Sequence, residues 1–384
     1  MHSELNVLHS CPIWLPTTQK WMYNMISNLP DRVENVILCD KTKNLDAFPY
    51  KNIYSKKEMF IPFAIEEGLK RLGIVNSSFL LKRTLARTKP DILHSHFGDR
   101  AWEDSNLQIG DHIKQIAHFY GYDVGMIVQE DERWTDRYYQ LFDRVDRVLC
   151  EGSFMAKSIR NLGCPGHKIR VYRLGVEVEK LPFKPRKWNG KSVLKILIAG
   201  SFREKKGIPY ALEALAMLKN KVPLEINIIG DSDKREKYQR EKENILSTAR
   251  SHGLMDLITW HGMVNHETLI EEALNNHLFM SPSVTAQDGD TEGGCPVTII
   301  ELSATGMPVL STTHCDIPEV VLDGETGYLS SERNVEELYD NTIKLLENVD
   351  SWDKMAEKGR SHITENYNVE RQGTELGDIY DELL

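Results

Sequence analysis

Short, uniformly apolar runs alternate with longer amphipathic stretches along the whole chain. Uniform apolar runs are typical of parallel strands buried on both faces, whereas apolar residues at helical spacing indicate amphipathic helices. In the first half, the predicted strands are 6–8, 33–38, 92–94, 116–119 and 144–150. Helical spacing is present at 19–28, 65–72 and 153–162, and Ser153 is expected to be the N-cap of the last helix.

The same alternation restarts after 181–192, a segment rich in Pro and Lys. The predicted strands there are 194–199, 224–229, 257–260, 278–281 and 308–311. The predicted helices are 209–218, 237–251, 267–274 and 297–305, before a long final helical region. Repeated strand–helix alternation predicts the α/β class with doubly wound parallel sheets. We therefore expect one domain at 1–180, a linker at 181–192 and a second domain at 193–365.

Length and composition agree with two globular domains. The chain has 384 residues, and domains average roughly 150 residues. Hydrophobic residues make up 41% and charged residues 27%, which excludes disordered and collagen-like chains. We expect neither a signal peptide nor a membrane-spanning helix, because no apolar run approaches the ~20 residues that a span needs. The six cysteines are widely spaced, which favours a reduced, cytoplasmic protein without a zinc site.

Charge is distributed unevenly between the two halves. The total is −10, which makes general nucleic-acid binding an unfavourable interpretation. Residues 1–190 hold 28 Lys and Arg against 23 Asp and Glu, a net of +5, whereas 191–384 hold 19 against 34, a net of −15. The stretch 41–90 has 11 basic and 4 acidic residues around the apolar run 59–65. Such a face is typical either of peripheral contact with an anionic membrane or of an ordinary solvated surface.

Two common phosphate-binding motifs are absent from the sequence. No glycines have the G-x-G-x-x-G spacing, which argues against a dehydrogenase. Gly190-Lys191-Ser192 resembles the end of a P-loop, but the glycine required five positions earlier is Pro185. Asp288 and Asp290 form a carboxylate pair of the kind that hard cations favour, although carboxylates in surface loops commonly bind no metal.

The most informative stretch begins with the loop 292–296, of sequence Glu-Gly-Gly-Cys-Pro, which opens into an apolar helix containing Glu301. Pro296 suits the first turn of a helix, where its missing N–H costs nothing. The free N–H groups beside two glycines form an anion site, and nearby carboxylates can accept hydrogen bonds from sugar hydroxyls. A turn followed by an amphipathic helix is the purely structural alternative.

At this point the residues carry a family resemblance. Glu292 and Glu301, followed by ATGMPV at 304–309 and by IPEVV with a later Asp-Gly at 317–327, resemble the donor-site region of the retaining glycosyltransferases of family 4. The resemblance extends to GSFREKKG at 200–207, to 153–175, to HSHFG at 94–98 and to FYGYDV at 119–124. The resemblance covers about residues 5–365. Within the family, the chain is similar in particular to the branch that builds bacterial exopolysaccharides and surface glycans.

The resemblance implies a GT-B fold, in which two Rossmann-like domains face each other across a cleft. It implies a metal-independent hexosyltransferase with a UDP- or GDP-sugar as a substrate rather than a cofactor. The acceptor would be a glycan or a lipid-diphosphate-linked glycan, reached at the inner face of the cytoplasmic membrane by peripheral contact through 41–90. The final segment, 366–384, would be a helix that crosses back to the first domain.

The resemblance also assigns roles to residues. Lys206 and Arg203 would neutralise the donor diphosphate, and Glu292 would hold the sugar hydroxyls as the third catalytic residue. Glu301 would hold the ribose, while Ser201 and the loop Gly293, Gly294 and Cys295 would bind the diphosphate, and Gly262 and Met263 would lie at the base. Tyr120, His118, Asp123 and His96 would line the cleft side of the first domain.

Three departures from the family pattern affect these roles. Eight residues separate Glu292 from Glu301, where the family has seven, and the extra residue falls in the glycine loop. Ser201 stands where the family has Arg, so Arg203 is expected to supply that charge. Tyr120 stands where the family has His, and His118 precedes it by two positions.

Two alternative functions belong to other classes. A nucleotide-sugar epimerase of the same shape would need acid–base groups near the sugar, for which His118, His96 and Asp123 are candidates. A non-catalytic subunit that binds a nucleotide or glycan is the other alternative, and it is motivated by Ser201 in the altered loop. A Glu301→Ala variant separates them, because an enzyme would lose turnover while a scaffold would keep its partner.

Overall fold

The computed structural model describes residues 4–16, 19–55, 79–107, 109–110 and 112–384. The apolar run 59–65 and the helix expected at 65–72 lie outside these residues. The described chain forms two compact units, Met1–Gly175 with Val369–Leu384, and Val176–Asn368. Within the described part, no helix is long and apolar enough to cross a bilayer.

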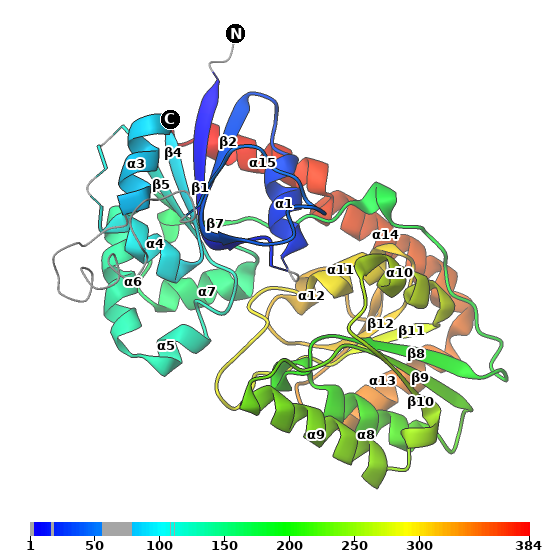
Figure 1. Ribbon diagram of the computed structural model, residues 1–384. Helices are drawn as coiled ribbons and strands as arrows, with labels where there is room; N and C mark the ends of the chain where they lie inside the picture. The colour runs from blue at the N-terminus through cyan, green and yellow to red at the C-terminus, as the bar shows by residue number, and fades with distance from the viewer. Residues whose placement is uncertain (1–3, 17–18, 56–78, 108, 111) are drawn as a thin grey trace. The chain divides into compact units, whose positions relative to one another are not determined.

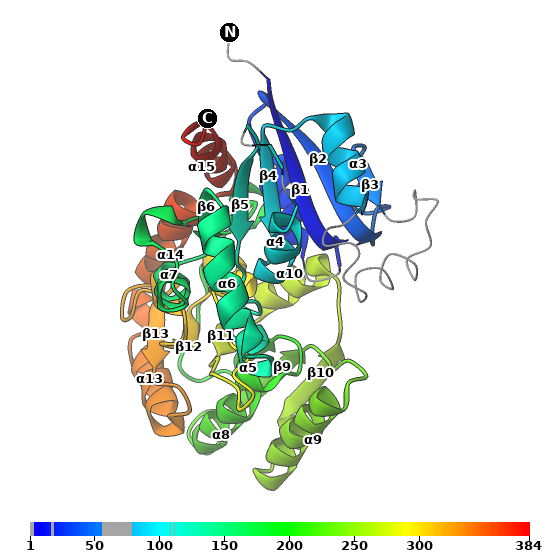
Figure 2. The same ribbon diagram turned by 90° about the vertical axis from the view of Figure 1, so that its left-hand side faces the viewer.

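The first unit is built on a seven-stranded parallel sheet in the order β3-β2-β1-β4-β5-β6-β7, and β1 to β6 lie side by side in Figure 2. The strands are β1 Leu5–Trp14, β2 Val33–Thr42, β3 Ile53–Ser55, β4 Ile92–His96, β5 Lys114–His118, β6 Arg147–Cys150 and β7 Ile169–Val171. The helices are α1 Lys20–Ser27, α3 Phe79–Thr88, α4 Gly98–Ser105, α5 Met126–Glu130, α6 Arg133–Arg144, α7 Ser153–Asn161 and α15 Val369–Asp381, with the 3₁₀ turn η2 Gly166–Lys168.

The second unit has a six-stranded parallel sheet in the order β10-β9-β8-β11-β12-β13 (Figure 1). Its strands are β8 Leu194–Ala199, β9 Leu224–Ile229, β10 Ile258–Gly262, β11 Leu278–Ser281, β12 Val309–Thr312 and β13 Gly327–Ser330. The α-helices are α8 Ile208–Leu218, α9 Glu236–Ser251, α10 His266–Asn275, α11 Val297–Ala304, α12 Ile317–Val320, α13 Val335–Glu347 and α14 Trp352–Tyr367. The 3₁₀ turns are η3 Val178–Lys180, η4 Glu204–Lys206, η5 Met255–Leu257 and η6 Val349–Ser351.

Both faces of the second sheet are buried, as its uniformly apolar strands predict. Ile196 and Ile198 of β8 pack with α8, α9 and α13 on one face, whereas Leu197 between them packs with α10, α11 and α14 on the other. Successive side chains of a strand point to opposite faces, so a strand buried on both faces is mostly apolar, and the one charged residue of β8, Lys195, is only half-buried. Figure 1 shows α8 and α9 on one side of this sheet and α10 and α11 on the other. The result is a doubly wound α/β unit.

The first unit is layered in the same way. Residues of α1 and α15 pack with β1 and β2 in one apolar cluster, and residues of α3 pack in another. A third cluster joins α6 and α7 to β5 and β6. The final segment Val369–Leu384 therefore completes the core of the first unit, because Leu376, Ile379 and Tyr380 are fully buried there.

Several local expectations differ from the structure. The segment 181–192 packs against the second unit, because the Arg186 guanidinium donates to the carbonyls of Ala273, Asn276 and Thr305 and Trp188 is buried in that core. Strand β6 begins at Arg147, since Arg144 still belongs to α6. Gly152 occupies the N-cap position of α7, so Ser153 is its first helical residue. The expected final helical region is present and consists of three helices, α13 to α15.

Each sheet has one place where the strand order reverses, between β1 and β4 and between β8 and β11. In open α/β sheets, ligands bind beyond the carboxyl ends of the strands at this place. In the second unit, the loops there are 200–207, after β8, and 282–296, after β11. A close backbone approach joins them: Gly207 has φ of 62°, and a Cβ on it would lie 1.9 Å from the Pro282 carbonyl oxygen. Only glycine fits this position.

Candidate active site

Lys206 and Glu292 form an ion pair at the strand-order reversal of the second unit. Their closest nitrogen–oxygen distance is 2.8 Å, and the side chains are only 18% and 6% exposed. Lys206 ends the 3₁₀ turn η4 after β8, and Glu292 lies in the loop after β11. The structure thus brings together two residues that are 86 positions apart and that the family resemblance assigned to one donor site.

The surroundings of Glu292 keep its carboxylate ionised. Burial alone would raise its pKa, but the charges of Lys206 and Lys205, with hydrogen bonds from Lys206 and Ser283, lower the pKa to about 2. The Ser283 hydroxyl donates to Oε1 of Glu292 at 2.8 Å, and Lys206 Nζ donates to Oε2 at 3.0 Å. The site therefore holds a fixed negative charge beside a fixed positive one.

The carboxylates of Asp288 and Asp290 are each paired with a lysine. Lys205 Nζ lies 2.9 Å from Asp290 and also donates to the Thr291 carbonyl. Lys237 Nζ lies 3.1 Å from Asp288, whose carboxylate also accepts the Asp290 N–H. A divalent cation would have to displace both lysines, so this arrangement fits a role in holding the loop better than a role as metal ligands.

Arg203 lies with its guanidinium over the Tyr238 ring, 4.9 Å from the ring centroid. The Arg235 guanidinium approaches the same ring at 4.3 Å, and it also pairs with Asp233. Tyr238 of α9 thus positions two cations near the loop 200–207. Ser201, at the family's arginine position, is half-buried, and its carbonyl accepts the Arg203 N–H at 2.8 Å.

The residues expected at the ribose and base lie along β10, α10 and α11. Glu301 is in the second turn of α11 and accepts a hydrogen bond from His266 Nε2 at 2.9 Å. Gly262 ends β10 with φ of 67°, and Met263 after it is exposed. Pro296 occupies the N-cap position of α11, one residue before the expected place in its first turn. Gly293 and Gly294 are buried and Cys295 is half-buried before this helix.

In the first unit, four histidines form a fully buried network around the strand-order reversal. His9 of β1 is paired in register with His94 of β4, and His96 is paired with His118 of β5. Hydrogen bonds link His9 Nδ1 to His96 Nε2 at 3.1 Å and His94 Nε2 to His118 Nδ1 at 3.2 Å. The sequence reasoning selected His96 and His118 but missed His9 and His94. The signal that could have found them is a histidine on each of three neighbouring strands.

Two tyrosines and one asparagine complete this network. Tyr120 and Tyr380 lie with their hydroxyls 2.7 Å from Nδ1 of His96 and His94, and Asn35 Oδ1 lies 3.0 Å from His9 Nε2. Burial lowers the pKa of His9 to about 4 and that of His118 to about 3, and the pKa values of His94 and His96 also fall well below the usual range. The network is therefore electrically neutral at pH 7.

Three ring nitrogens of His9, His94 and His96 lie within 4.8 Å of one another, and three histidines can bind zinc. However, the His96 ring is nearly parallel to the other two, at 18° to His9 and 21° to His94, while His9 and His94 are tilted by 38°. A metal lies in the plane of each ring that binds it, so stacked rings do not direct their lone pairs to one point. Hydrogen bonding accounts better for this cluster.

The other candidates of the first unit differ in exposure. Asp123 is fully buried and accepts the N–H groups of Gly98 at 2.8 Å and Tyr120 at 3.0 Å. Burial outweighs these hydrogen bonds and raises the pKa of Asp123 to about 7. His96 and His118 have no exposed surface, whereas Tyr120 is 9% exposed. Of the four residues expected to line a cleft, only Tyr120 has a measurable part of its side chain at the surface.

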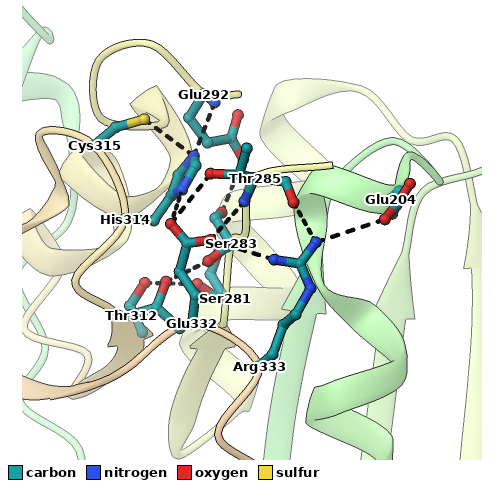
Figure 3. Close-up of polar contacts among 11 residues, drawn as sticks. Glu204, Ser281, Ser283, Thr285, Glu292, Thr312, His314, Cys315, Glu332 and Arg333 are labelled. Atoms are coloured by element: carbon teal, nitrogen blue, oxygen red, sulfur yellow. Dashed lines mark hydrogen bonds and ion pairs between the residues drawn. The ribbon is translucent and has the colours of Figure 1, made fainter. Parts of the chain in front are cut away.

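A second group that the sequence reasoning missed lies behind Glu292. His314 follows β12 and accepts the Glu292 backbone N–H through Nε2 at 3.1 Å, while its Nδ1 lies 2.6 Å from Glu332 after β13 (Figure 3). These positions follow the carboxyl ends of strands in the same sheet, which is the signal that could have found them.

Family models match both units of the chain. The model described as "Glycosyltransferase Family 4" matches residues 18–180, and the model described as "Glycosyl transferases group 1" matches residues 182–362. Together they span most of the chain, including every loop of the site described above.

Individual proteins give the same result. The amylovoran biosynthesis glycosyltransferase AmsK of Erwinia amylovora is 30% identical over 321 residues, which cover 82% of this chain and 76% of AmsK. WcaL of Escherichia coli (strain K12), named for colanic acid biosynthesis, is 27% identical over 321 residues, 81% of this chain and 76% of WcaL. The crystal structure of Anabaena HepE in complex with UDP and glucose has a TM-score of 0.76 at 12% identity and covers 99% of this chain and 100% of its own, which shows a shared fold.

Proposed function

The chain belongs to the glycosyltransferases of the group 1 and family 4 type, with the GT-B fold, and from this premise we propose that it transfers a sugar from a UDP- or GDP-sugar with retention of the anomeric configuration. The acceptor that we propose is a glycan or a lipid-linked glycan in surface polysaccharide biosynthesis. AmsK and WcaL, which are named for the biosynthesis of two such polymers, support this choice.

The observation that carries the proposal is the Lys206–Glu292 pair at the strand-order reversal of the second unit. The difficult step of the reaction is departure of the nucleoside diphosphate, and fixed positive charge beside it stabilises the transition state. Lys206 supplies that charge, and Arg203 is the second cation near the same loop. Glu292, held ionised, accepts hydrogen bonds from the donor sugar, and Glu301 exchanges His266 for the ribose hydroxyls.

A binding experiment tests the donor site. Melting temperature is measured with UDP, GDP and ADP, each in EDTA and again with magnesium. A nucleotide at about 100 times its Kd stabilises the folded protein by roughly 2.7 kcal/mol. We expect UDP or GDP to raise the melting temperature in EDTA. A rise only with magnesium would replace the metal-free site with one at Asp288 and Asp290, and no rise with any nucleotide would contradict the proposal.

Retention and membrane contact each need a measurement of their own. With an α-linked donor such as UDP-glucose, proton NMR of the sugar first released to water should show the α anomer, and the β anomer would contradict retention.

Flotation with vesicles containing anionic lipid tests the peripheral contact through 41–90, part of which lies outside the described residues. We expect binding that weakens at high salt, because the attraction is between opposite charges.

A further inference from the structure

His314 connects three groups behind the donor site. Its Nε2 lies 3.1 Å from the Glu292 backbone nitrogen and 3.1 Å from Cys315 Sγ, and its Nδ1 lies 2.6 Å from Glu332 Oε1 (Figure 3). The His314 side chain is 1% exposed. None of these three contacts was assigned a role by the resemblance to the family.

The partners fix which nitrogen of His314 carries the proton. A carboxylate can only accept, so Nδ1 donates to Glu332, and a backbone N–H can only donate, so Nε2 accepts from Glu292. Burial raises the pKa of Cys315 to about 12, so its thiol keeps its proton and can also donate to Nε2. All three neighbours therefore select the same neutral tautomer.

Glu332 holds the other side of the same loop. Its Oε2 accepts the Thr285 backbone N–H at 2.7 Å. Thr285 is two residues after Ser283, whose hydroxyl donates to the Glu292 carboxylate and whose carbonyl accepts the Thr312 hydroxyl. Glu332 thus fixes both ends of the 285–292 loop: Thr285 directly and Glu292 through His314.

Arg333 connects the 285–292 loop to the loop that carries Lys206. Its guanidinium contacts the Thr285 carbonyl and lies 3.7 Å from Glu204 and 3.6 Å from Glu332. Glu204 begins the same 3₁₀ turn that Lys206 ends. Figure 3 shows Arg333 between Thr285 and Glu204.

We propose that His314 and Glu332 are positioning residues that hold Glu292 in the orientation that binds the donor sugar. The proposal rests on the proposed function, in which Glu292 contacts the sugar and Lys206 the diphosphate. His314 is bonded to the backbone N–H of Glu292 and not to its carboxylate, so it controls where the carboxylate points without altering its charge. A displacement of about 1 Å at a reacting group can cost on the order of 10²-fold in rate.

Two substitutions of His314 separate its two hydrogen bonds. In His314→Gln, the amide can reach the place of Nε2 and accept the Glu292 N–H. In His314→Asn, the amide reaches only the place of Nδ1, so it can donate to Glu332 but leaves Glu292 without its acceptor. Glu332→Gln is nearly isosteric, but it has one acceptor oxygen where Nδ1–H of His314 and the Thr285 N–H require two. Glu325→Gln, which changes an exposed carboxylate paired with Lys358, is the matched control.

The measured quantity is the ratio of the Kd for UDP to the Kd for UDP-glucose, determined by calorimetry, with GDP and GDP-mannose as a second pair. We expect His314→Asn and Glu332→Gln to lower this ratio about 10-fold or more while the Kd for the free nucleotide changes little, because the defect is at the sugar. His314→Gln should retain more of the ratio than His314→Asn, and Glu325→Gln should retain all of it. General destabilisation would instead lower the melting temperature and weaken both ligands alike.

A Glu292→Gln variant distinguishes failure of this inference from failure of the proposed function. If Glu292→Gln lowers the ratio while His314→Asn and Glu332→Gln leave it unchanged, the positioning role is overturned and the function of Glu292 stands. If Glu292→Gln itself leaves the ratio unchanged, the charge of Glu292 does not hold the sugar and the positioning inference is overturned with it, whereas the proposed function is contradicted only if no nucleotide binds.

Discussion

The two units place polar side chains at the same point of their sheets and keep them there in opposite ways. In the first unit, His9, His94, His96 and His118 are fully buried and neutral, and they bond to one another and to tyrosine hydroxyls. In the second unit, Lys206 and Glu292 are charged and partly reached by solvent, at 18% and 6% exposure. A network of neutral hydrogen-bonded side chains has no charge with which to bind a phosphate, whereas an ion pair can exchange one partner for an ionic ligand. Of these two clusters, the charged one is therefore the better suited to bind an ionic ligand such as a diphosphate.

Acidification should destabilise the histidine network of the first unit at a higher pH than the Lys206–Glu292 pair of the second unit. An unfolded histidine gains its proton near pH 6.5, but the buried rings hold pKa values of about 4 and 3 at His9 and His118 and well below 6.5 at the other two. Below pH 6.5 the unfolded chain therefore binds protons that the folded chain does not, and stability falls. Glu292, with its pKa lowered to about 2, loses its contribution only as the pH falls below about 4.5.

The expected slope is about 1.4 kcal/mol per pH unit for each histidine that stays neutral. Asp123 cancels the contribution of one histidine to this slope. Its pKa is raised to about 7, so it gains a proton on folding at pH 5, whereas each histidine loses one. Urea unfolding at pH 7, 6 and 5 measures how the free energy of unfolding changes with pH. Hydrogen exchange of peptides from β4 and β11 then shows the change in each unit separately. His94→Leu should flatten the slope, and His167→Gln, at an exposed position, should not. A stability that does not fall between pH 6.5 and 5 would contradict the neutral network.

Lys206→Met tests the charged side of the comparison. It removes the cation that we place at the diphosphate, and loss of one such group typically lowers the rate by ~10²–10³. UDP release from UDP-glucose, or GDP release from GDP-mannose, measures the effect. The matched control is Lys195→Met, which removes a half-buried lysine paired with Glu225 at 3.1 Å, outside the loops of the site. Wild-type turnover in Lys206→Met would remove Lys206 from the site.

Glu301→Ala should weaken donor binding rather than stability. Hydrogen bonds to a charged group contribute about 1.5–3 kcal/mol, so we expect the Kd for the nucleotide to rise roughly 10- to 100-fold. His266 is 41% exposed and loses only one partner, so the melting temperature should change little. Glu267→Ala, an exposed position in the first turn of α10, is the control. Nucleotide affinity equal to wild type would mean that Glu301 contacts no ribose.

The fold could be predicted from the sequence to a large extent, because uniform apolar runs specify strands locally. The bounds predicted for 194–199, 224–229 and 278–281 coincide with β8, β9 and β11. The short strands β3, β7 and β13 were missed, since none of them has three consecutive apolar residues, whereas β11, with only four residues, has the run 278–280. Fold class and family membership are both confirmed by the two parallel sheets and by the family models.

The candidate site could be predicted only in part, because its contacts join distant segments. The resemblance selected Lys206 and Glu292 but assigned them to different parts of the donor, and it did not indicate that they bind each other. His9 and His94 escaped because their pairing depends on the register between β1 and β4. His314 escaped because its partner is a backbone N–H, which leaves no pattern of residue types.

Tyr120→Phe has the smallest expected effect. Of the four residues expected to line the cleft side of the first unit, Tyr120 is the one that is partly exposed. The Tyr120 hydroxyl donates to His96 Nδ1 at 2.7 Å, and its loss leaves a buried acceptor unpaired, which costs about 1–3 kcal/mol of folding free energy. The ring stays packed against His118, with centroids 4.2 Å apart, so the network should loosen rather than collapse. Tyr139→Phe, on the exposed side of α6, is the control. If Tyr120 belongs only to the neutral network, stability falls while the donor Kd and turnover per folded molecule hold. A loss of turnover at full occupancy would instead show that the first unit, too, exchanges a network partner for substrate.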